Sequence, residues 1–279
     1  MTSSTLTVEN LNVVYPSDHG KVAALRDVSF SLGRERLGVV GESGSGKSTL
    51  GRAIMRLLQP PARMSAERME LQGRDLLTLP DREFDRLRGK RMSMIFQDPK
   101  YSLNPMMTVG SQIIEAYQAH LRGGRAQAYR AAVDILASVK IHDPEAVMRL
   151  YPHQVSGGMG QRVMIAMMLV SAPDLLIADE PTSALDVTVQ RSLLTVLDEL
   201  ISERGMSLIL ISHNIPLVAT FCDRILVMYA GRIVETCVAS RLSEAKHPYT
   251  LGLIAALPNL QLRRDRLPQL QRDPAWLAS

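Results

Sequence analysis

The sequence predicts an α/β fold with a parallel sheet at its centre, an antiparallel β subdomain at the N-terminus and an inserted α-helical subdomain. Short apolar runs at 37–40, 175–178 and 208–211 are typical of strands buried on both faces. Helical patterns separate these runs, and strands that alternate with helices indicate a parallel sheet. Apolar and polar residues alternate over Leu6–Tyr15 and Val28–Leu32, which indicates half-buried strands of an antiparallel sheet.

The remaining elements follow along the chain. A helix is predicted over 49–58, where Pro60-Pro61 ends it, and a strand over 92–96. The apolar spacing between about 108 and 170 is helical. Further predictions are a helix at 187–203, strands at 224–228 and 232–235, a helix at about 250–256 and an irregular tail.

These elements divide the chain into three parts. The expected parts are a core with its β subdomain at 1–97 and 173–240, a helical insertion at 98–172, and a C-terminal extension at 241–279.

The composition limits the class of protein. The chain has 279 residues, 46% of them apolar, and a net charge of +4 with scattered arginines, which argues against a nucleic-acid partner. Its cysteines, Cys222 and Cys237, have no spacing typical of a disulfide framework or a metal site, so a reduced cytosolic setting is expected. No apolar run reaches the roughly 18–20 residues that cross a bilayer. Residues 1–6 do not resemble a signal peptide. The sequence therefore predicts a chain that is soluble by itself, for which any membrane role must be peripheral and depend on a partner.

A phosphate-binding loop follows the strand at 37–40 and opens a helix at Thr49. It matches the pattern G-x-x-x-x-G-K-[ST] with Gly41, Glu42, Ser43, Gly44, Ser45, Gly46, Lys47 and Ser48. Glycines let backbone N–H groups approach phosphate oxygens, and the helix N-terminus adds positive potential. Lys47 is expected to reach the β- and γ-phosphates of ATP, and Ser48 to bind Mg²⁺. The alternative is an ordinary glycine-rich turn.

Two acidic residues end the apolar run at 175–178. A buried strand would deliver Asp179 to the carboxyl edge of the sheet, where a carboxylate can hold Mg²⁺. Glu180 is then placed to polarise the attacking water as a general base. The alternative is a pair of surface acids at the end of a strand.

Together these motifs resemble those of the ATP-binding subunits of ABC transporters, over about residues 5–257. Within that resemblance Tyr15 would stack on adenine, Gln97 would touch Mg²⁺ and sense the membrane partner, and His213 would hydrogen-bond the γ-phosphate. The signature is matched by Ser156, Gly157 and Gly158, and the D-loop by residues 183–186, ending in Asp186. The resemblance implies a dimer in which the signature of one chain binds the γ-phosphate held by the other.

Three stretches resemble the oligopeptide, dipeptide and nickel importers: 97–105, Tyr151–Gln154 and Lys246–Thr250. This resemblance implies an importer of peptides, or alternatively of nickel or a metal chelate. It also implies two transmembrane permease subunits, a second ATP-binding subunit (different or identical) and an extracytoplasmic solute-binding protein. The chain would then lie at the cytoplasmic face of the bacterial inner membrane.

Some residues depart from the family pattern or allow another reading. Gly160 stands where a larger residue is expected, which puts local helix stability in doubt. Asn214-Ile215-Pro216 follows His213 where an Asp-Leu pair is common. The methionines between 159 and 168 are expected to pack in a helix core instead of binding metal. A non-transport ABC ATPase and a P-loop GTPase or kinase remain as alternative classes.

Overall fold

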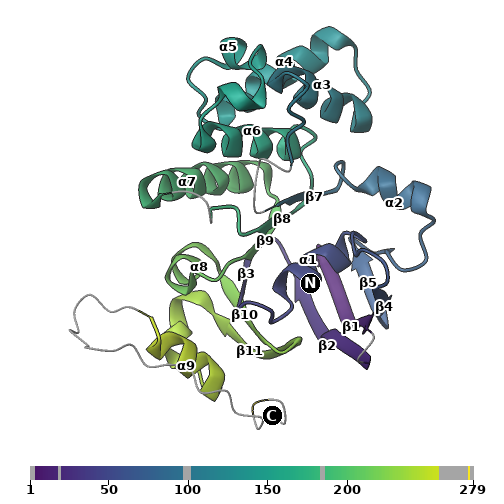
Figure 1. Ribbon diagram of the computed structural model, residues 1–279, viewed down its shortest axis with the longest axis vertical. Helices are drawn as coiled ribbons and strands as arrows, with labels where there is room; N and C mark the ends of the chain where they lie inside the picture. Colours follow the sequence, from purple (N-terminus) through teal and green to yellow (C-terminus); the bar gives the residue numbers. More distant parts are fainter. Residues whose placement is uncertain (1–3, 18–19, 97–101, 183–185, 258–275, 277–279) are drawn as a thin grey trace. The chain divides into compact units, whose positions relative to one another are not determined.

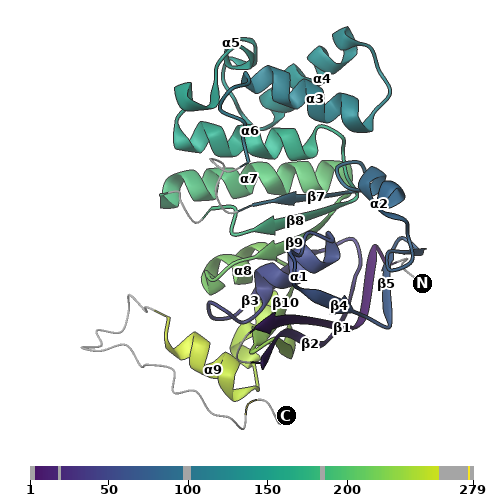
Figure 2. The same ribbon diagram turned by 45° about the vertical axis from the view of Figure 1, so that its right-hand side comes forward.

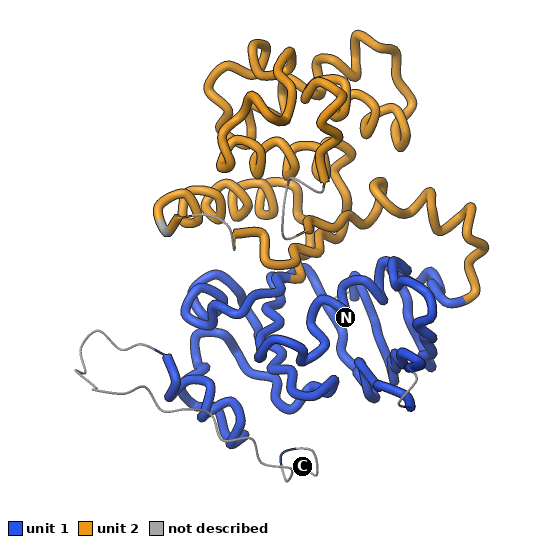
Figure 3. Tube along the Cα trace, viewed as in Figure 1, with its two compact units in different colours: residues 1–77, 210–279 blue, residues 78–209 orange. Residues whose placement is uncertain are grey.

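The computed structural model describes residues 4–17, 20–96, 102–182, 186–257 and 276. The chain forms two compact units (Figure 3). The first unit comprises residues 1–77 and 210–279, and the second comprises residues 78–209. Because residues 78–209 lie between the two segments of the first unit, the second unit is an insertion in its sequence.

An antiparallel sheet forms the N-terminal part of the first unit (Figures 1 and 2). The strand order is β2-β1-β5-β6, and β4 also pairs with β1. Alternate apolar side chains of β1 are fully buried, as the sequence pattern predicts. The strands are β1 (Leu6–Ser17), β2 (Gly20–Leu32), β4 (Arg63–Ser65), β5 (Arg68–Leu71) and β6 (Arg74–Asp75).

A second group of strands in the first unit leads to the phosphate-binding loop. β3 (Arg36–Val40) runs parallel to β10 (Arg224–Tyr229), and β11 (Arg232–Val238) pairs antiparallel with β10. Helix α8 (Ile215–Phe221) packs closely on β3 at Gly38. Glycine is needed there, because a Cβ would lie 2.2 Å from Val218 Cγ1. The other helices are α1 (Lys47–Ile54), the 3-10 helix η3 (Ala239–Glu244) and α9 (Pro248–Ala255).

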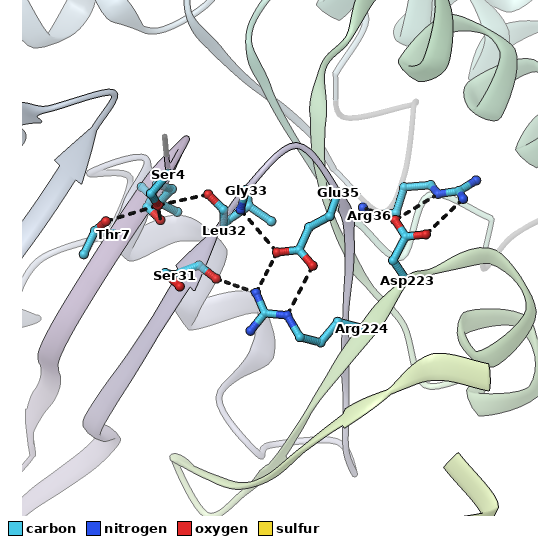
Figure 4. A network of polar contacts seen from close by, with 10 residues as sticks. Ser4, Thr7, Ser31, Leu32, Gly33, Glu35, Arg36, Asp223 and Arg224 are labelled. Atoms are coloured by element: carbon cyan, nitrogen blue, oxygen red, sulfur yellow. Dashed lines mark hydrogen bonds and ion pairs between the residues drawn. The ribbon is translucent and has the colours of Figure 1, made fainter. Parts of the chain in front are cut away.

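Reciprocal ion pairs join the starts of β3 and β10 (Figure 4). The guanidinium of Arg224 donates to both carboxylate oxygens of Glu35, at 2.7 and 3.2 Å. Arg36, the residue after Glu35, donates to Asp223, the residue before Arg224, from its backbone N–H at 2.7 Å and from its side chain at 3.1 Å. Two-point arginine–carboxylate contacts fix direction as well as distance, so they set the register of the two strands.

The second unit combines parallel strands with a group of helices. β9 (Ser207–Ile211), β8 (Leu175–Asp179) and β7 (Met92–Ile95) are neighbours in that order, and the last two residues of β9 belong to the first unit. α3 to α6 form the helical cluster in Figures 1 and 2. The helices are α2 (Asp81–Leu87), α3 (Val109–His120), α4 (Arg125–Ser138), α5 (Pro144–Met148), the 3-10 helix η2 (Pro152–Gln154), α6 (Gly157–Leu169) and α7 (Val187–Arg204).

Several predicted boundaries need correction. Helix α1 ends at Ile54 and not at residue 58, since Arg56 adopts a left-handed φ of 49°. β2 begins at Gly20, eight residues before the predicted strand, because the hairpin with β1 continues to its turn. β4 to β6 were not predicted, since segments this short show little periodicity. Of the predicted irregular tail after residue 257, only Trp276 is described.

The two departures from the family pattern have defined places in the structure. Gly160 lies inside α6, and its N–H donates to the Ser156 carbonyl at 2.8 Å, so glycine does not break the helix. Asn214 caps α8 by accepting from Leu217 N at 3.2 Å, which gives that departure a structural role. Both cysteines are free thiols. Within the described ranges, no helix has the length and apolar character needed to cross a membrane.

Candidate nucleotide site

The phosphate-binding loop, residues 41–48, lies in the first unit between β3 and α1. Gly41 has a φ of 152°, and a Cβ there would lie 2.2 Å from the Met228 carbonyl oxygen. Gly46 has a φ of 103°, and a Cβ there would lie 2.6 Å from the Ala24 carbonyl oxygen. Both glycines are therefore required by backbone conformation and by space. The loop thus packs closely against β10 at Gly41 and against β2 at Gly46.

Lys47 is buried, and its ammonium group points back into the loop. Nζ donates to the carbonyl oxygens of Gly41 at 2.8 Å and Glu42 at 2.7 Å. Burying an ammonium group is costly unless it is hydrogen-bonded, and these carbonyls meet that need. The arrangement keeps a positive charge at the centre of the loop, which is the electrostatic requirement for binding a phosphate.

The turn after β10 forms a backbone hydrogen bond with the loop. The backbone N–H of Gly231 donates to the Ser45 carbonyl at 3.0 Å, and the Gly231 carbonyl accepts from Arg26 N at 2.8 Å. A cavity of about 300 Å³ opens beside the loop, lined by Glu42, Ser43, Gly44, Ser45, Tyr229 and Ala230.

The other predicted residues of the first unit lie at recognisable positions. Ser48 and Thr49 are half-buried in the first turn of α1. Tyr15 is half-buried in β1, opposite Val22 of β2. Exposed His213 follows β9, and Ser212 N donates to the Val39 carbonyl at 3.1 Å. His213 is therefore brought to the edge of β3 where the phosphate-binding loop begins.

The acidic pair lies at the end of β8 in the second unit. Asp179 is buried as the last residue of the strand, and Glu180 follows with a left-handed φ of 48°. A non-glycine residue in this region costs about 1–3 kcal/mol, and such strain clusters at functional sites. β8 runs parallel to β7, and Ala178 pairs with Ile95. The residues that follow this pair in both strands therefore lie at the same carboxyl edge of the sheet. Gln97 lies outside the described residues.

The signature segment opens α6. Ser156 is the N-cap, and its Oγ accepts from Met159 N at 3.3 Å. Ser156 and Gly157 are exposed. A Cβ added to Gly157 would meet nothing within 4 Å, whereas one on Gly158 would lie 3.2 Å from Val189 Cγ1. Gly158 therefore packs closely on α7, whereas no described residue of the unit requires glycine at position 157.

Asp186, from the predicted D-loop, caps α7. Its Oδ1 accepts from Thr188 N and Val189 N, both at 3.0 Å. The preceding residues 183–185 lie outside the described part of the chain. Near the signature, a groove of about 390 Å³ is lined by Leu103, Pro105, Pro152, His153, Val155, Ser156, Gly157 and Gly160.

Sequence reasoning missed one residue at the loop. The Glu42 N–H donates to the phenolic oxygen of Tyr249 at 2.9 Å, across 207 positions of sequence. Tyr249 is fully buried, with no exposed surface. The stretch Lys246–Thr250 was noticed only as a family resemblance. Tyr249 directly follows Pro248, which starts a helix. This local pattern predicts the helix but does not indicate that its tyrosine contacts the loop.

A glycine-rich loop after a buried strand, with a buried lysine aimed into it, defines a P-loop nucleotide-binding protein. Among the described residues, no group of three or more His, Cys, Asp or Glu side chains could hold a metal ion. Met164 is fully buried in α6.

A family model described as ABC transporter matches residues 25–183, and the chain belongs to that family. The oligopeptide transport ATP-binding protein OppD of Escherichia coli is 45% identical over 96% of this chain and 80% of its own length. The dipeptide transport ATP-binding protein DppD of the same organism is 46% identical over 95% of this chain and 82% of its own length. The resemblance drawn from the sequence is confirmed.

The solved structures agree. A dimeric, post-hydrolysis ATP-binding cassette, MJ0796, bound to ADP and Pi, has a TM-score of 0.75 and 25% identity, covering 84% of this chain and 98% of that chain. The predicted cassette fold is therefore confirmed. The chain is an ABC-type ATPase that binds and hydrolyses ATP.

Proposed function

We propose that this chain is the ATP-hydrolysing subunit of a binding-protein-dependent importer of peptides. The observation that carries the proposal is the phosphate-binding loop around Lys47, in a chain 45% identical to an oligopeptide transport ATP-binding protein and 46% identical to a dipeptide one. A glutathione import ATP-binding protein of Escherichia coli is also 46% identical, over 91% of this chain. Peptides and glutathione share an amide backbone, which favours peptides over nickel as cargo.

In the proposed site, the loop residues Gly41–Ser48 and Thr49 hold the phosphates, with Lys47 neutralising their charge. Tyr15 stacks on the adenine ring, and His213 donates a hydrogen bond to the γ-phosphate. Glu180 accepts a proton from the attacking water while the water oxygen bonds to the γ-phosphorus. The bond between the γ-phosphorus and the bridging oxygen then breaks, and ADP leaves. The left-handed backbone at Glu180 supports this role, since backbone strain of this kind clusters at functional sites.

Mg²⁺ fits the donor groups of this site. Ser48 offers a hydroxyl, Asp179 a carboxylate and Gln97 an amide oxygen, and oxygen is the ligand type that Mg²⁺ prefers. When bound, Mg²⁺ would neutralise charge on the β- and γ-phosphates.

The proposed working unit is a pair of ATPase chains. Ser156, Gly157 and Gly158 of one chain would contact the γ-phosphate held by the loop of the other, while Asp186 stands at the D-loop between the two sites. Gly157 supports this arrangement, because no contact within its own unit requires a glycine there. An approaching phosphate would require one. The second chain is identical or a different ATPase.

The remaining proposed partners are two transmembrane permease subunits and an extracytoplasmic solute-binding protein, with the chain at the cytoplasmic face of the inner membrane. The groove beside the signature and the 83% exposed Met106 offer apolar surface for a protein partner. We also propose that residues 1–97 and 173–240 act as the ATP-binding core, 98–172 as the helical insertion and 241–279 as an extension.

The test of this function combines hydrolysis with uptake. Glu180→Gln should abolish steady-state ATP hydrolysis and accumulate an ATP-dependent dimer by light scattering, because the base is lost while phosphate binding remains. Cells lacking the chain should regain uptake of labelled di- and oligopeptides with the wild type but not with Glu180→Gln. Unchanged hydrolysis in Glu180→Gln would refute the assigned base. Restored nickel uptake without peptide uptake would refute the cargo.

A further inference from the structure

A segment near the C-terminus reaches the phosphate-binding loop. This segment, residues 246–256 (the C-terminal arm), is anchored to β11 by Glu235. The Glu235 carboxylate accepts from Lys246 N at 2.6 Å and from His247 N at 3.3 Å. Burial alone would raise the pKa of Glu235, but these hydrogen bonds lower it overall. The arm is thus held by charge-assisted hydrogen bonds, which are stronger than neutral ones.

Tyr249 is held rigidly in the first turn of α9. His247 caps this helix, its Nδ1 accepting from Tyr249 N at 3.2 Å, and Pro248 occupies the first turn. The Tyr249 ring packs against Tyr229 with centroids 4.5 Å apart and against Trp276 at 5.6 Å. A fully buried ring between aromatic neighbours has few rotamers, so the position of its hydroxyl is well defined.

Tyr249 and Lys47 hold opposite sides of one peptide group in the loop. The group joins Gly41 to Glu42. Its carbonyl accepts from Lys47 Nζ at 2.8 Å, and its N–H donates to the Tyr249 hydroxyl at 2.9 Å. The C=O and N–H of a trans peptide point in opposite directions, so one contact on each side fixes its rotation. This rotation matters because Gly41, with a φ of 152°, has the conformational freedom of glycine on one side of the peptide group.

We infer that Tyr249 is a positioning residue for ATP binding, acting through the backbone of Glu42. The inference rests on the proposed role of the loop. A phosphate would draw Lys47 away from the Gly41 carbonyl and release one side of the peptide group. The Tyr249 hydroxyl still holds the other side, so the loop keeps its shape while Lys47 turns to the nucleotide. The C-terminal arm is thereby part of the nucleotide site.

Tyr249→Phe tests this, since it keeps the ring and removes the hydroxyl that accepts the Glu42 N–H. Loss of one buried hydrogen bond should raise the dissociation constant and KM for ATP about five- to tenfold. The kcat should change less than twofold, because ground state and transition state lose the same support. Hydrogen exchange at the loop, measured by mass spectrometry without nucleotide, should become faster.

Tyr117→Phe is the matched control, since it removes the hydroxyl of a buried tyrosine in α3, outside the nucleotide site, and leaves the Tyr249–Glu42 bond in place. Its ATP affinity and loop exchange should match the wild type. Wild-type ATP affinity and loop exchange in Tyr249→Phe would overturn the inference, as would equal losses in both variants. If Lys47→Ala also left ATP affinity unchanged, the phosphate-loop assignment itself would fall. Affinity lost in Lys47→Ala but kept in Tyr249→Phe would refute Tyr249 alone.

Discussion

The ammonium nitrogen of Lys47 lies 2.8 Å from the carbonyl oxygen of Gly41, the residue that begins the phosphate-binding loop. The lysine thus closes a ring with the loop that carries it. Carbonyl oxygens bear only partial charge, so a phosphate oxygen with a full charge competes favourably for the same ammonium group. This hydrogen bond gives the loop a defined shape and keeps the Lys47 ammonium group ready to bind a phosphate oxygen.

Lys47→Ala should weaken ATP binding by about 10- to 100-fold, because a hydrogen bond to a charged group contributes roughly 1.5–3 kcal/mol. Isothermal titration with ATP measures the effect. Lys140→Ala is the control, since it removes an exposed ammonium group paired with Glu199 at 2.8 Å in the second unit. Equal affinity in Lys47→Ala and the wild type would contradict the assignment of the loop.

Gly157→Asp should leave the chain folded but inactive. An added Cβ meets no atom within 4 Å, and an acidic residue at a helix N-terminus is favourable, so the melting temperature should not fall. The new charge would repel the phosphate held by the partner chain, and ATP hydrolysis should drop by at least about tenfold.

Gly157→Asn is the matched control, because it has nearly the same size without the charge. Its hydrolysis should exceed that of Gly157→Asp. ATP binding to the loop of either variant should stay normal in equilibrium titration. Full hydrolysis in Gly157→Asp would argue against a γ-phosphate contact at this position.

Gly160→Ala should stabilise the protein by about 0.4–1 kcal/mol, since glycine inside a helix loses more backbone entropy on folding. The added Cβ would lie 3.8 Å from Val155 Cγ2, an ordinary contact distance. Urea unfolding measures the difference. A lower unfolding midpoint would show that α6 needs the glycine for a reason other than the space around it.

Asp223→Asn should destabilise the protein only where the carboxylate is ionised. Burial alone would raise the pKa of Asp223, but hydrogen bonds from the side chain and backbone of Arg36 lower it below its ordinary value of 3.8. A lowered carboxyl pKa contributes stability above 3.8 that is lost as pH falls through the folded-state value. The expected loss at pH 7 is about 0.5–1 kcal/mol, since the pair is partly exposed.

Urea unfolding of Asp223→Asn and the wild type across this pH range checks the prediction. The difference between them should shrink steadily below pH 3.8. Asp85→Asn is the control, because Asp85 in α2 pairs with Arg88, the residue that follows this short helix, and does not join β3 to β10. A difference that is constant with pH would show that the carboxylate charge has no part in holding the two strands.

Much of the site was predictable because its motifs are local. The loop pattern, the acids at the end of β8 and the serine that caps α6 each depend on a few adjacent residues in one element. The order of strands and helices followed from hydrophobic periodicity. β4 to β6 were missed, because they are two to four residues long and have no pattern apart from their pairing with β1 and with one another.

The sequence by itself determined the phosphate-binding loop, the acidic pair and the family, because backbone freedom at glycine and charge at lysine are properties of residue type and spacing. The tertiary structure alone decided that Tyr249 lies against Glu42, and that Glu35 and Asp223 pair with Arg224 and Arg36. These contacts join residues more than 180 positions apart. Such partners are chosen by how strands and helices pack, which no local pattern encodes.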